Sequence, residues 1–214
     1  MICFVGTSFA PTHLKAAALK RGLILTDDLE KAELVFVSED TPTNEKGERD
    51  LDYIRELTLK TWDDSACPLV LTSQVPPGFT RSLEIPIYHM AETLRVTQDT
   101  EERALNPEQI ILGCEHPQQA LPLSLLHYLN VFNAPVSLVS WETAECAKIV
   151  INLMLAEQVE ATNRLSSWTE NQGGNWDEIR VILDRDKRIG KYTKPGNWRD
   201  SRHLLRDWVT YSKP

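Results

Sequence analysis

The sequence predicts an α/β protein in which a mainly parallel sheet is followed by a long central helix and a helical segment. Three observations lead to this fold class. The chain opens with a short apolar run, a turn and a helical pattern, and further apolar runs then alternate with amphipathic stretches. Such alternation is typical of a parallel sheet with helices on both faces. Residues 142–174 then form one helical pattern, with no glycine or proline before Gly173.

The composition argues against several classes of function. The net charge of −8 argues against nucleic acid as the main partner, and no apolar run is long enough for a membrane span. The four cysteines are scattered without a CxxC pair, and the five histidines lack metal-ligand spacing. We therefore expect a cytoplasmic protein with reduced thiols and no metal site.

The first strand and helix are ICFVG, which ends at Gly6, and HLKAAALKRG, which is closed by Gly22. The turn between them reads GTSFAP. A dinucleotide fingerprint needs GxGxxG, so that the backbone can approach the pyrophosphate and the helix can pack on the strand. Only Gly6 is in place, because Ser8 and Pro11 stand at the second and third glycine positions. Since proline is accepted at a helix start, the fold tolerates this change better than the cofactor contact does.

A possible second strand, LILT, passes almost directly into the strand ELVFVS. An acidic residue about twenty positions after the glycine turn would bind the adenosine ribose, and Asp27 and Asp28 lie near that distance. Either could instead cap the short DLEKA turn, which is the interpretation we favour. On this interpretation the adenosine half of a dinucleotide site is cut away.

The middle of the chain supplies the remaining strands and helices. LDYIRELTLKTW predicts an amphipathic helix, PLVLTSQV a buried strand, and PPGFTRSL a helix with proline at its start. PEQIILG and APVSLVS predict strands on either side of the helix LPLSLLHYLNVF. The nearest feature to a domain boundary is Ser140–Trp141, which divides the chain into residues 1–139 and 140–214.

The helix of residues 142–174 would be a rod of roughly 45 Å. Apolar residues surround it almost completely over residues 144–156, so we expect its first half to be buried. Lys148 and Asn152 lie four residues apart within this half and share one face. Taken alone, they are more simply a lysine that reaches solvent and an asparagine that bonds locally. The alternative is a site pair, in which a desolvated lysine stands beside an amide that orients a ligand oxygen.

The stretch ETAECAKIVINLMLAEQVEATNRL resembles the central helix of the UDP-glucose/GDP-mannose 6-dehydrogenase family, which carries a Lys and an Asn four residues apart and a further Asn near the end. Asn163 stands at the further position. LTSQVPPGFTRSL, AETLRV with NPEQIILG, and LDRDKRIG occur in the family's order and spacing. The resemblance implies a trimmed, Rossmann-like, NAD-binding-type domain over residues 1–139 and a helical dimerisation domain over residues 140–214. It also implies a nucleotide sugar as ligand and NAD as cofactor, although the altered turn makes NAD binding weak or lost.

The resemblance assigns site residues in the first half of the chain. The cofactor side comprises Gly6, Ser8, Ser73 and Thr41, of which Thr41 lies in the DTPT segment that resembles the family's TPT. Gln74 stands where most relatives have a threonine that helps to place catalytic water.

Glu92 matches the first glutamate of the family motif PEFLREG, whereas Val96 replaces the second, functional one. A structural carboxylate at Glu92 is as good an interpretation as a site residue.

After the long helix, the resemblance makes Arg188 of the RIG segment a candidate ligand for an anion or sugar, in the site of a partner subunit. The family then has GxGFGGSCFxKD, whose Cys carries a thioester, where this chain has GNWRDSRHLLRD. His203 stands at the Cys position, and Arg206 and Asp207 take the place of the final Lys-Asp. Because imidazole cannot form the thiohemiacetal needed for a second oxidation, the chain could carry out at most a two-electron step.

Three functions remain open from the sequence. The first is a NAD-linked oxidoreductase of a sugar nucleotide, in which Lys148 and Asn152 orient the sugar oxygen and Gln74 holds water. The second is a non-catalytic relative that binds a nucleotide or sugar phosphate, and the third is a dimeric assembly protein. We expect a homodimer through the helix of residues 142–174, because a monomer would expose a large apolar patch. The alternative is that the flanking segments LPLSLLHYLNVF and NWDEIRVILDRD cover this helix within one chain.

Overall fold

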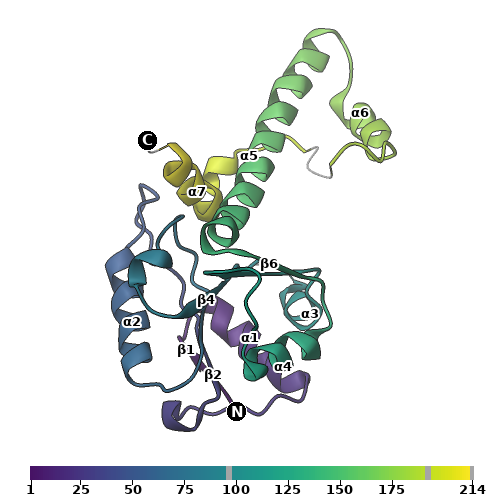
Figure 1. Cartoon of the computed structure of the whole chain (residues 1–214). Helices are drawn as coiled ribbons and strands as arrows, with labels where there is room; N and C mark the ends of the chain where they lie inside the picture. The colour runs from purple at the N-terminus through teal and green to yellow at the C-terminus, as the bar shows by residue number, and fades with distance from the viewer. Residues whose placement is uncertain (95–97, 191–193, 213–214) are drawn as a thin grey trace. The chain divides into compact units, whose positions relative to one another are not determined.

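A computed structural model describes residues 1–94, 98–190 and 194–212 of the chain (Figure 1). The chain divides into two compact units. The first unit comprises Met1–Pro42 and Arg49–Lys148, and the second comprises Thr43–Glu48 and Ile149–Pro214. The two units are described separately below.

The first unit is built on a six-stranded sheet whose order follows the sequence, β1-β2-β3-β4-β5-β6. All neighbours are parallel except β4 and β5, which are antiparallel. The strands are β1 (Ile2–Val5), β2 (Leu34–Val37), β3 (Leu69–Leu71), β4 (Ile87–Met90), β5 (Ile110–Cys114) and β6 (Val136–Ser140). The predicted fold class is therefore confirmed, as a mainly parallel sheet within an α/β unit.

In this order β1 is an edge strand. A doubly wound dinucleotide-binding sheet of order 3-2-1-4-5-6 places two further strands beyond its first one, on the adenosine side. Within the described residues, β1 has only an isolated bridge on that side, between Ile2 and Leu25. The predicted second strand LILT is thus wrong, because residues 23–26 pass the edge with this one bridge and continue to the next turn.

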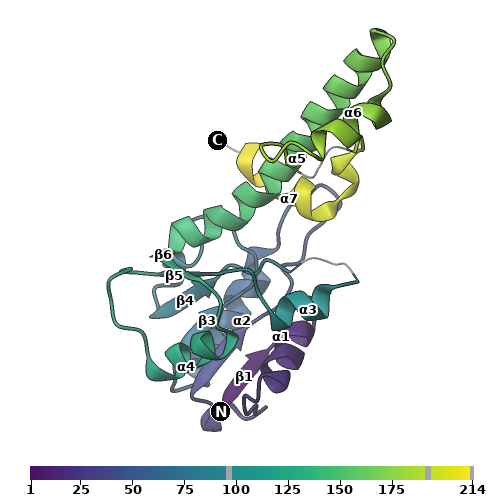
Figure 2. The same cartoon turned by 90° about the vertical axis from the view of Figure 1, so that its right-hand side faces the viewer.

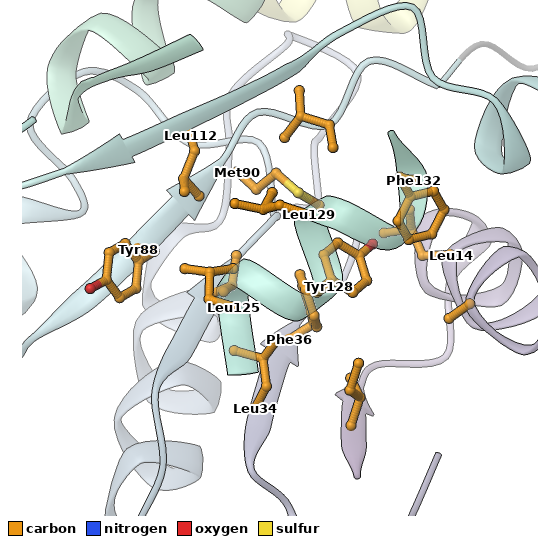
Figure 3. Close-up of a cluster of buried hydrophobic side chains, with 14 of the residues drawn as sticks. Leu14, Leu34, Phe36, Tyr88, Met90, Leu112, Leu125, Tyr128, Leu129 and Phe132 are labelled. Atoms are coloured by element: carbon orange, nitrogen blue, oxygen red, sulfur yellow. The ribbon is translucent and has the colours of Figure 1, made fainter. Parts of the chain in front are cut away.

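Helices cover both faces of the sheet (Figures 1 and 2). One face carries α1 (Phe9–Lys20), α3 (Thr100–Leu105) and α4 (Leu123–Phe132), and the other carries α2 (Leu51–Asp63). Figure 3 shows how α4 lays its apolar side chains over the strands. The ring of Phe36 stacks on Phe4 with 4.8 Å between the ring centroids and meets Tyr128 of α4 at 4.6 Å.

The opposite face buries Ile54 of α2 and the indole of Trp141, which donates a hydrogen bond of 2.9 Å to the carbonyl oxygen of Ile87. The helix predicted to start at PPGFTRSL is wrong. A turn stands there, followed by a 3-10 helix, η2 (Arg81–Leu83). Gly78 has a φ of 88°, which right-handed helix does not allow, so the chain reverses there instead of winding.

α5 (Trp141–Asn171) has 31 residues and runs from the first unit into the second. It ends where the glycines predict, since Gly173 has a φ of 79° and the Gly174 amide bonds back to the Thr169 carbonyl at 2.9 Å. The expected burial of its first half is wrong in part, because Val150 and Met154 are 52% and 57% exposed whereas Ala144, Ile149 and Ala156 are buried. Apolar residues surround this half of the helix, but the chain packs against only one side of it. The single chain therefore buries only that face.

The second unit continues α5 with α6 (Trp176–Leu183), a 3-10 helix η3 (Trp198–Asp200) and α7 (Arg202–Ser212). Asn175 caps α6 by accepting a hydrogen bond from the Asp177 amide at 2.9 Å. Within the part of the chain that the structure describes, no helix combines the length and the apolar character that crossing a membrane requires.

Candidate functional site

The predicted cofactor residues lie together in the first unit, at the carboxyl ends of β1, β2 and β3. Gly6 ends β1 with a φ of 133°, and a Cβ there would lie 2.1 Å from the carbonyl oxygen of Ser38. No other residue fits this close approach of two strand ends. The hydroxyl of Ser8 lies across the same gap and accepts a hydrogen bond of 2.8 Å from the Asp40 amide.

The loops after β2 and β3 are joined by the next two predicted residues. The hydroxyl of Thr41 donates a hydrogen bond of 2.6 Å to the carbonyl oxygen of Gln74. The hydroxyl of Ser73 accepts one of 3.2 Å from the Glu39 amide. These hydroxyls therefore join one loop of the chain to another, and the Gln74 side chain is half-buried beside them.

The first turn does not fit a dinucleotide. The Thr7 amide, which would face a pyrophosphate, donates a hydrogen bond of 2.9 Å to the carboxylate of Glu39. At the ribose end, Asp28 accepts from the Glu30 amide at 3.1 Å and caps the 3-10 helix η1 (Leu29–Lys31), which confirms the predicted capping role. The Thr7 amide and the Asp28 carboxylate are therefore both engaged in hydrogen bonds within the chain.

Glu92 and Lys148 lie elsewhere in the first unit. Glu92 follows β4, and its carboxylate accepts a hydrogen bond from the Leu94 amide two residues on, as in a local turn. The predicted loss of a second glutamate at Val96 falls outside the described residues. Lys148 lies half-buried on α5, one helical turn before Asn152.

Four of the predicted residues of the second unit form a polar cluster between α5 and α7, namely Asn152, His203, Arg206 and Asp207. The Asn152 amide donates a hydrogen bond of 2.6 Å to the carboxylate of Asp207, which is fully buried. The guanidinium of Arg206, itself 7% exposed, has its Nε 4.0 Å from the same carboxylate. A guanidinium nitrogen of Arg206 lies 3.4 Å from Nδ1 of His203. The cluster thus unites buried charge and amide groups with an exposed imidazole at its edge.

Arg188 does not join this cluster. It lies beyond α6 with an exposed side chain, and its guanidinium pairs with Asp186 in the same turn at 2.5 Å. The resemblance placed Arg188 in a partner's site, and the single chain leaves that assignment a prediction.

The sequence did not predict the contacts that hold the loop before α7 against α5. Asn163 and the backbone of Gly196 exchange two hydrogen bonds, of 2.8 and 2.9 Å. One turn earlier, Glu160 accepts hydrogen bonds from the Trp198 indole at 2.7 Å and from Arg199 at 2.8 Å. The spacing of Glu160 and Asn163 on one helix face was the available signal, because residues three apart are neighbours on a helix. These contacts position the segment that leads to His203 and Asp207.

Comparisons with known proteins show which proteins the chain is similar to. A sequence profile described as the UDP-glucose/GDP-mannose dehydrogenase family, central domain, matches residues 142–199. UDP-glucose 6-dehydrogenase of Rickettsia felis is 26% identical over 189 residues, which cover 83% of this chain and 42% of that protein. The enzyme of the same name from Pseudomonas aeruginosa is 26% identical over 197 residues, which cover 84% of this chain and 44% of that protein.

Two solved structures share the fold. The UDP-D-ManNAc dehydrogenase from Pyrococcus horikoshii superposes with a TM-score of 0.76 at 16% identity, covering 92% of this chain and 60% of that one. The UDP-glucose dehydrogenase from Pyrobaculum islandicum does so with a TM-score of 0.70 at 19% identity, covering 98% and 57%. The chain resembles the UDP-glucose/GDP-mannose dehydrogenase family. It spans about 42–44% of the length of these curated relatives.

The match to the family's central domain covers only part of the polar cluster. Asn152 lies inside residues 142–199, whereas the other members of the cluster, His203, Arg206 and Asp207, lie beyond them. The placing of His203 at the family's thiol position therefore depends on the resemblance of the loop sequence and on the contact between Asp207 and Asn152.

Proposed function

We propose that this relative of the nucleotide-sugar dehydrogenases binds a sugar nucleotide and does not oxidise it to the acid. The observation that carries the proposal is the composition of the cluster between α5 and α7. It contains an amide, a guanidinium and a buried carboxylate, and an imidazole lies at its edge. The resemblance of the loop sequence puts this imidazole where the family has a thiol.

The retained groups suit a polar, anionic ligand. A guanidinium presents several donors in a plane, which matches phosphate and sugar oxygens. The Asp207 carboxylate is fully buried and hydrogen-bonded to Asn152, so these two side chains are held in place before any ligand arrives. His203 has no sulfur to carry an acyl group, so the second oxidation of a sugar alcohol to an acid has no covalent route here.

The experiment is a calorimetric titration of the full chain with UDP-glucose, UDP-N-acetyl sugars and GDP-mannose. At least one should bind, and Asn152→Ala should weaken that binding by roughly tenfold or more, since it removes an amide held in the cluster. Asn130→Ala, on the exposed side of α4, is the matched control and should leave binding unchanged. Absence of binding by every sugar nucleotide would contradict the proposal.

A second candidate is a NAD-linked, two-electron oxidoreductase of the same ligand. It is favoured by Lys148 and Asn152, which remain four residues apart on α5 within the part matched by the family's central domain. Incubation with NAD and each sugar nucleotide distinguishes the two candidates. The oxidoreductase candidate predicts one NADH formed per sugar nucleotide, and no NADH with the Lys148→Met variant. Formation of two NADH per sugar nucleotide would contradict both candidates. We expect no NADH.

We also propose that the chain is a cytoplasmic homodimer, in which a helical dimerisation domain begins near residue 140. Support for the dimer comes from the second unit, where mostly apolar side chains of α5 and α7 line a groove. The lining residues are Val150, Leu153, Met154, Glu157, Trp208 and Tyr211.

A further inference from the structure

We propose that the carboxylate of Glu39 is a built-in anion that takes the place of a ligand phosphate at the turn between β1 and α1. On this proposal the first unit keeps the nucleotide-binding architecture but fills its anion position from within the chain. The inference explains the misfit of a dinucleotide and does not depend on the binding of a sugar nucleotide.

Both carboxylate oxygens of Glu39 accept backbone hydrogen bonds. Oε2 accepts from the Thr7 amide at 2.9 Å, and Oε1 accepts from the Asp40 amide at 3.1 Å. Backbone amides of a turn before a helix are the groups that hold phosphate oxygens in nucleotide-binding folds. The amide that a phosphate would use at Thr7 is therefore already engaged by an anion of the chain.

The helix itself lacks an anion of its own at this end. The first turn of α1 contains no acidic residue, and its N-cap residue Ser8 makes no capping hydrogen bond to the helix. Instead, the Ser8 hydroxyl accepts from the Asp40 amide at 2.8 Å. A negative charge near a helix N-terminus is stabilised by the macrodipole, and Glu39 supplies it from the neighbouring loop.

Contacts on both sides hold Glu39 in this position. On one side, Gly6 lets the end of β1 approach the Ser38 carbonyl, where a Cβ would lie at 2.1 Å. On the other, the Glu39 amide bonds to Ser73 at 3.2 Å and Thr41 bonds to Gln74 at 2.6 Å. The backbone around Glu39 is thus fixed by β1 and by the loop after β3.

The charge state agrees with this geometry. Burial raises the pKa of the Glu39 carboxyl, but hydrogen bonds from the Ser8 hydroxyl and from the amides of Thr7, Asp40 and Ser8 outweigh burial, and the pKa is lower than its ordinary value. Glu39 is therefore ionised at neutral pH, and it repels a second anion at the same amides.

The test is a titration of the full chain with inorganic pyrophosphate, followed by calorimetry and by thermal unfolding. The wild-type chain should bind no pyrophosphate beyond what it binds through the cluster between α5 and α7, which Asn152→Ala removes. Glu39→Ala opens the position and should bind pyrophosphate at least roughly tenfold more tightly than the wild type. Glu39→Gln removes the charge but keeps the size of the side chain, so it serves as the second variant if the alanine variant does not fold. It should show a smaller gain in the same direction.

Asp40→Asn is the matched control, because it removes the same charge from the adjacent, exposed residue. It should behave as the wild type does. The proposal is overturned if the wild type binds pyrophosphate as tightly as the Glu39 variants, if no folded Glu39 variant gains binding, or if Asp40→Asn gains as much. Binding of a sugar nucleotide by the wild type, and its loss in Asn152→Ala, test the proposed function separately.

Discussion

The amide of Asn152 on α5 donates a hydrogen bond of 2.6 Å to the carboxylate of Asp207 on α7, which is fully buried. A buried carboxylate is tolerated only when its oxygens are hydrogen-bonded or its charge is compensated. Asn152 supplies a hydrogen bond, and the guanidinium of Arg206, 4.0 Å away, supplies the charge. The contact therefore joins two residues of the proposed site and also stabilises the second unit.

Replacing Asn152 by alanine should lower the free energy of unfolding by about 1–3 kcal/mol, because Asp207 loses a donor while it stays buried. Asn152→Asp should cost more at neutral pH, because it places a second carboxylate against the first. That extra cost should shrink as the pH is lowered, since protonation of one carboxyl removes the repulsion. Urea unfolding measures both variants, and Asn130→Ala should stay within about 0.5 kcal/mol of the wild type. Equal stability of Asn152→Ala and the wild type would show that Asp207 does not need this donor.

Because His89 on β4 is buried, we expect the stability of the protein to depend on pH. It is 2% exposed, and burial lowers the pKa of its imidazole from 6.5 to about 4. The unfolded chain therefore takes up a proton on this residue at a higher pH than the folded chain does. The part of the free energy of unfolding that comes from keeping His89 neutral is fully present above pH 6.5. It is lost as the pH falls from there toward about 4.

Between pH 6.5 and about 4, protonation of His89 in the unfolded chain lowers the free energy of unfolding by about 3 kcal/mol at most. His89→Leu should remove this part of the acid sensitivity, whereas His127→Gln, at an exposed position on α4, should keep it. Chemical unfolding of the three proteins at several pH values measures the difference. Identical slopes for His89→Leu and the wild type would mean that His89 titrates normally in the folded protein.

The exposed apolar side of α5 predicts self-association. Val150 and Met154 are 52% and 57% exposed, and each would place an unpaired charge in a helix pair if changed to aspartate. Sedimentation equilibrium at micromolar concentration should show a dimer for the wild type and a monomer for Met154→Asp. Leu123→Asp, at a position on α4 that is 85% exposed, should remain dimeric. A wild-type species of 24.4 kDa would exclude the dimer.

Features that depend on residues close together in the chain could be predicted from the sequence. The cap at Asp28 and the end of α5 at Gly173 depend on residues within a few positions, so their signals are local. Hydrophobic periodicity predicted most of the strands and helices, but not β4, α3 or α7. The turn at Gly78 was missed, because proline at a helix start predicts a helix and the positive φ of the glycine is visible only in the fold.

Features that depend on strand pairing were not accessible. Thr7 and Glu39 lie 32 residues apart and meet only because β1 pairs with β2 in register. Val150 was expected to be buried, because an apolar residue in an apolar helix gives no sign of which side the chain covers. In the candidate site, the helical repeat was enough to put Lys148 and Asn152 on one face. The contact of Asn152 with Asp207 joins residues 55 positions apart, so it could be seen only in the folded structure.

If the carboxylate of Glu39 takes the place of a ligand phosphate, as proposed, the chain does not bind NAD at the turn between β1 and α1. A calorimetric titration of NAD into the wild-type chain tests it most directly. We predict no measurable heat, or a dissociation constant weaker than about 1 mM, because Glu39 occupies the Thr7 amide and the sheet has no paired strand beyond β1 within its described residues. A micromolar dissociation constant for NAD would contradict this account.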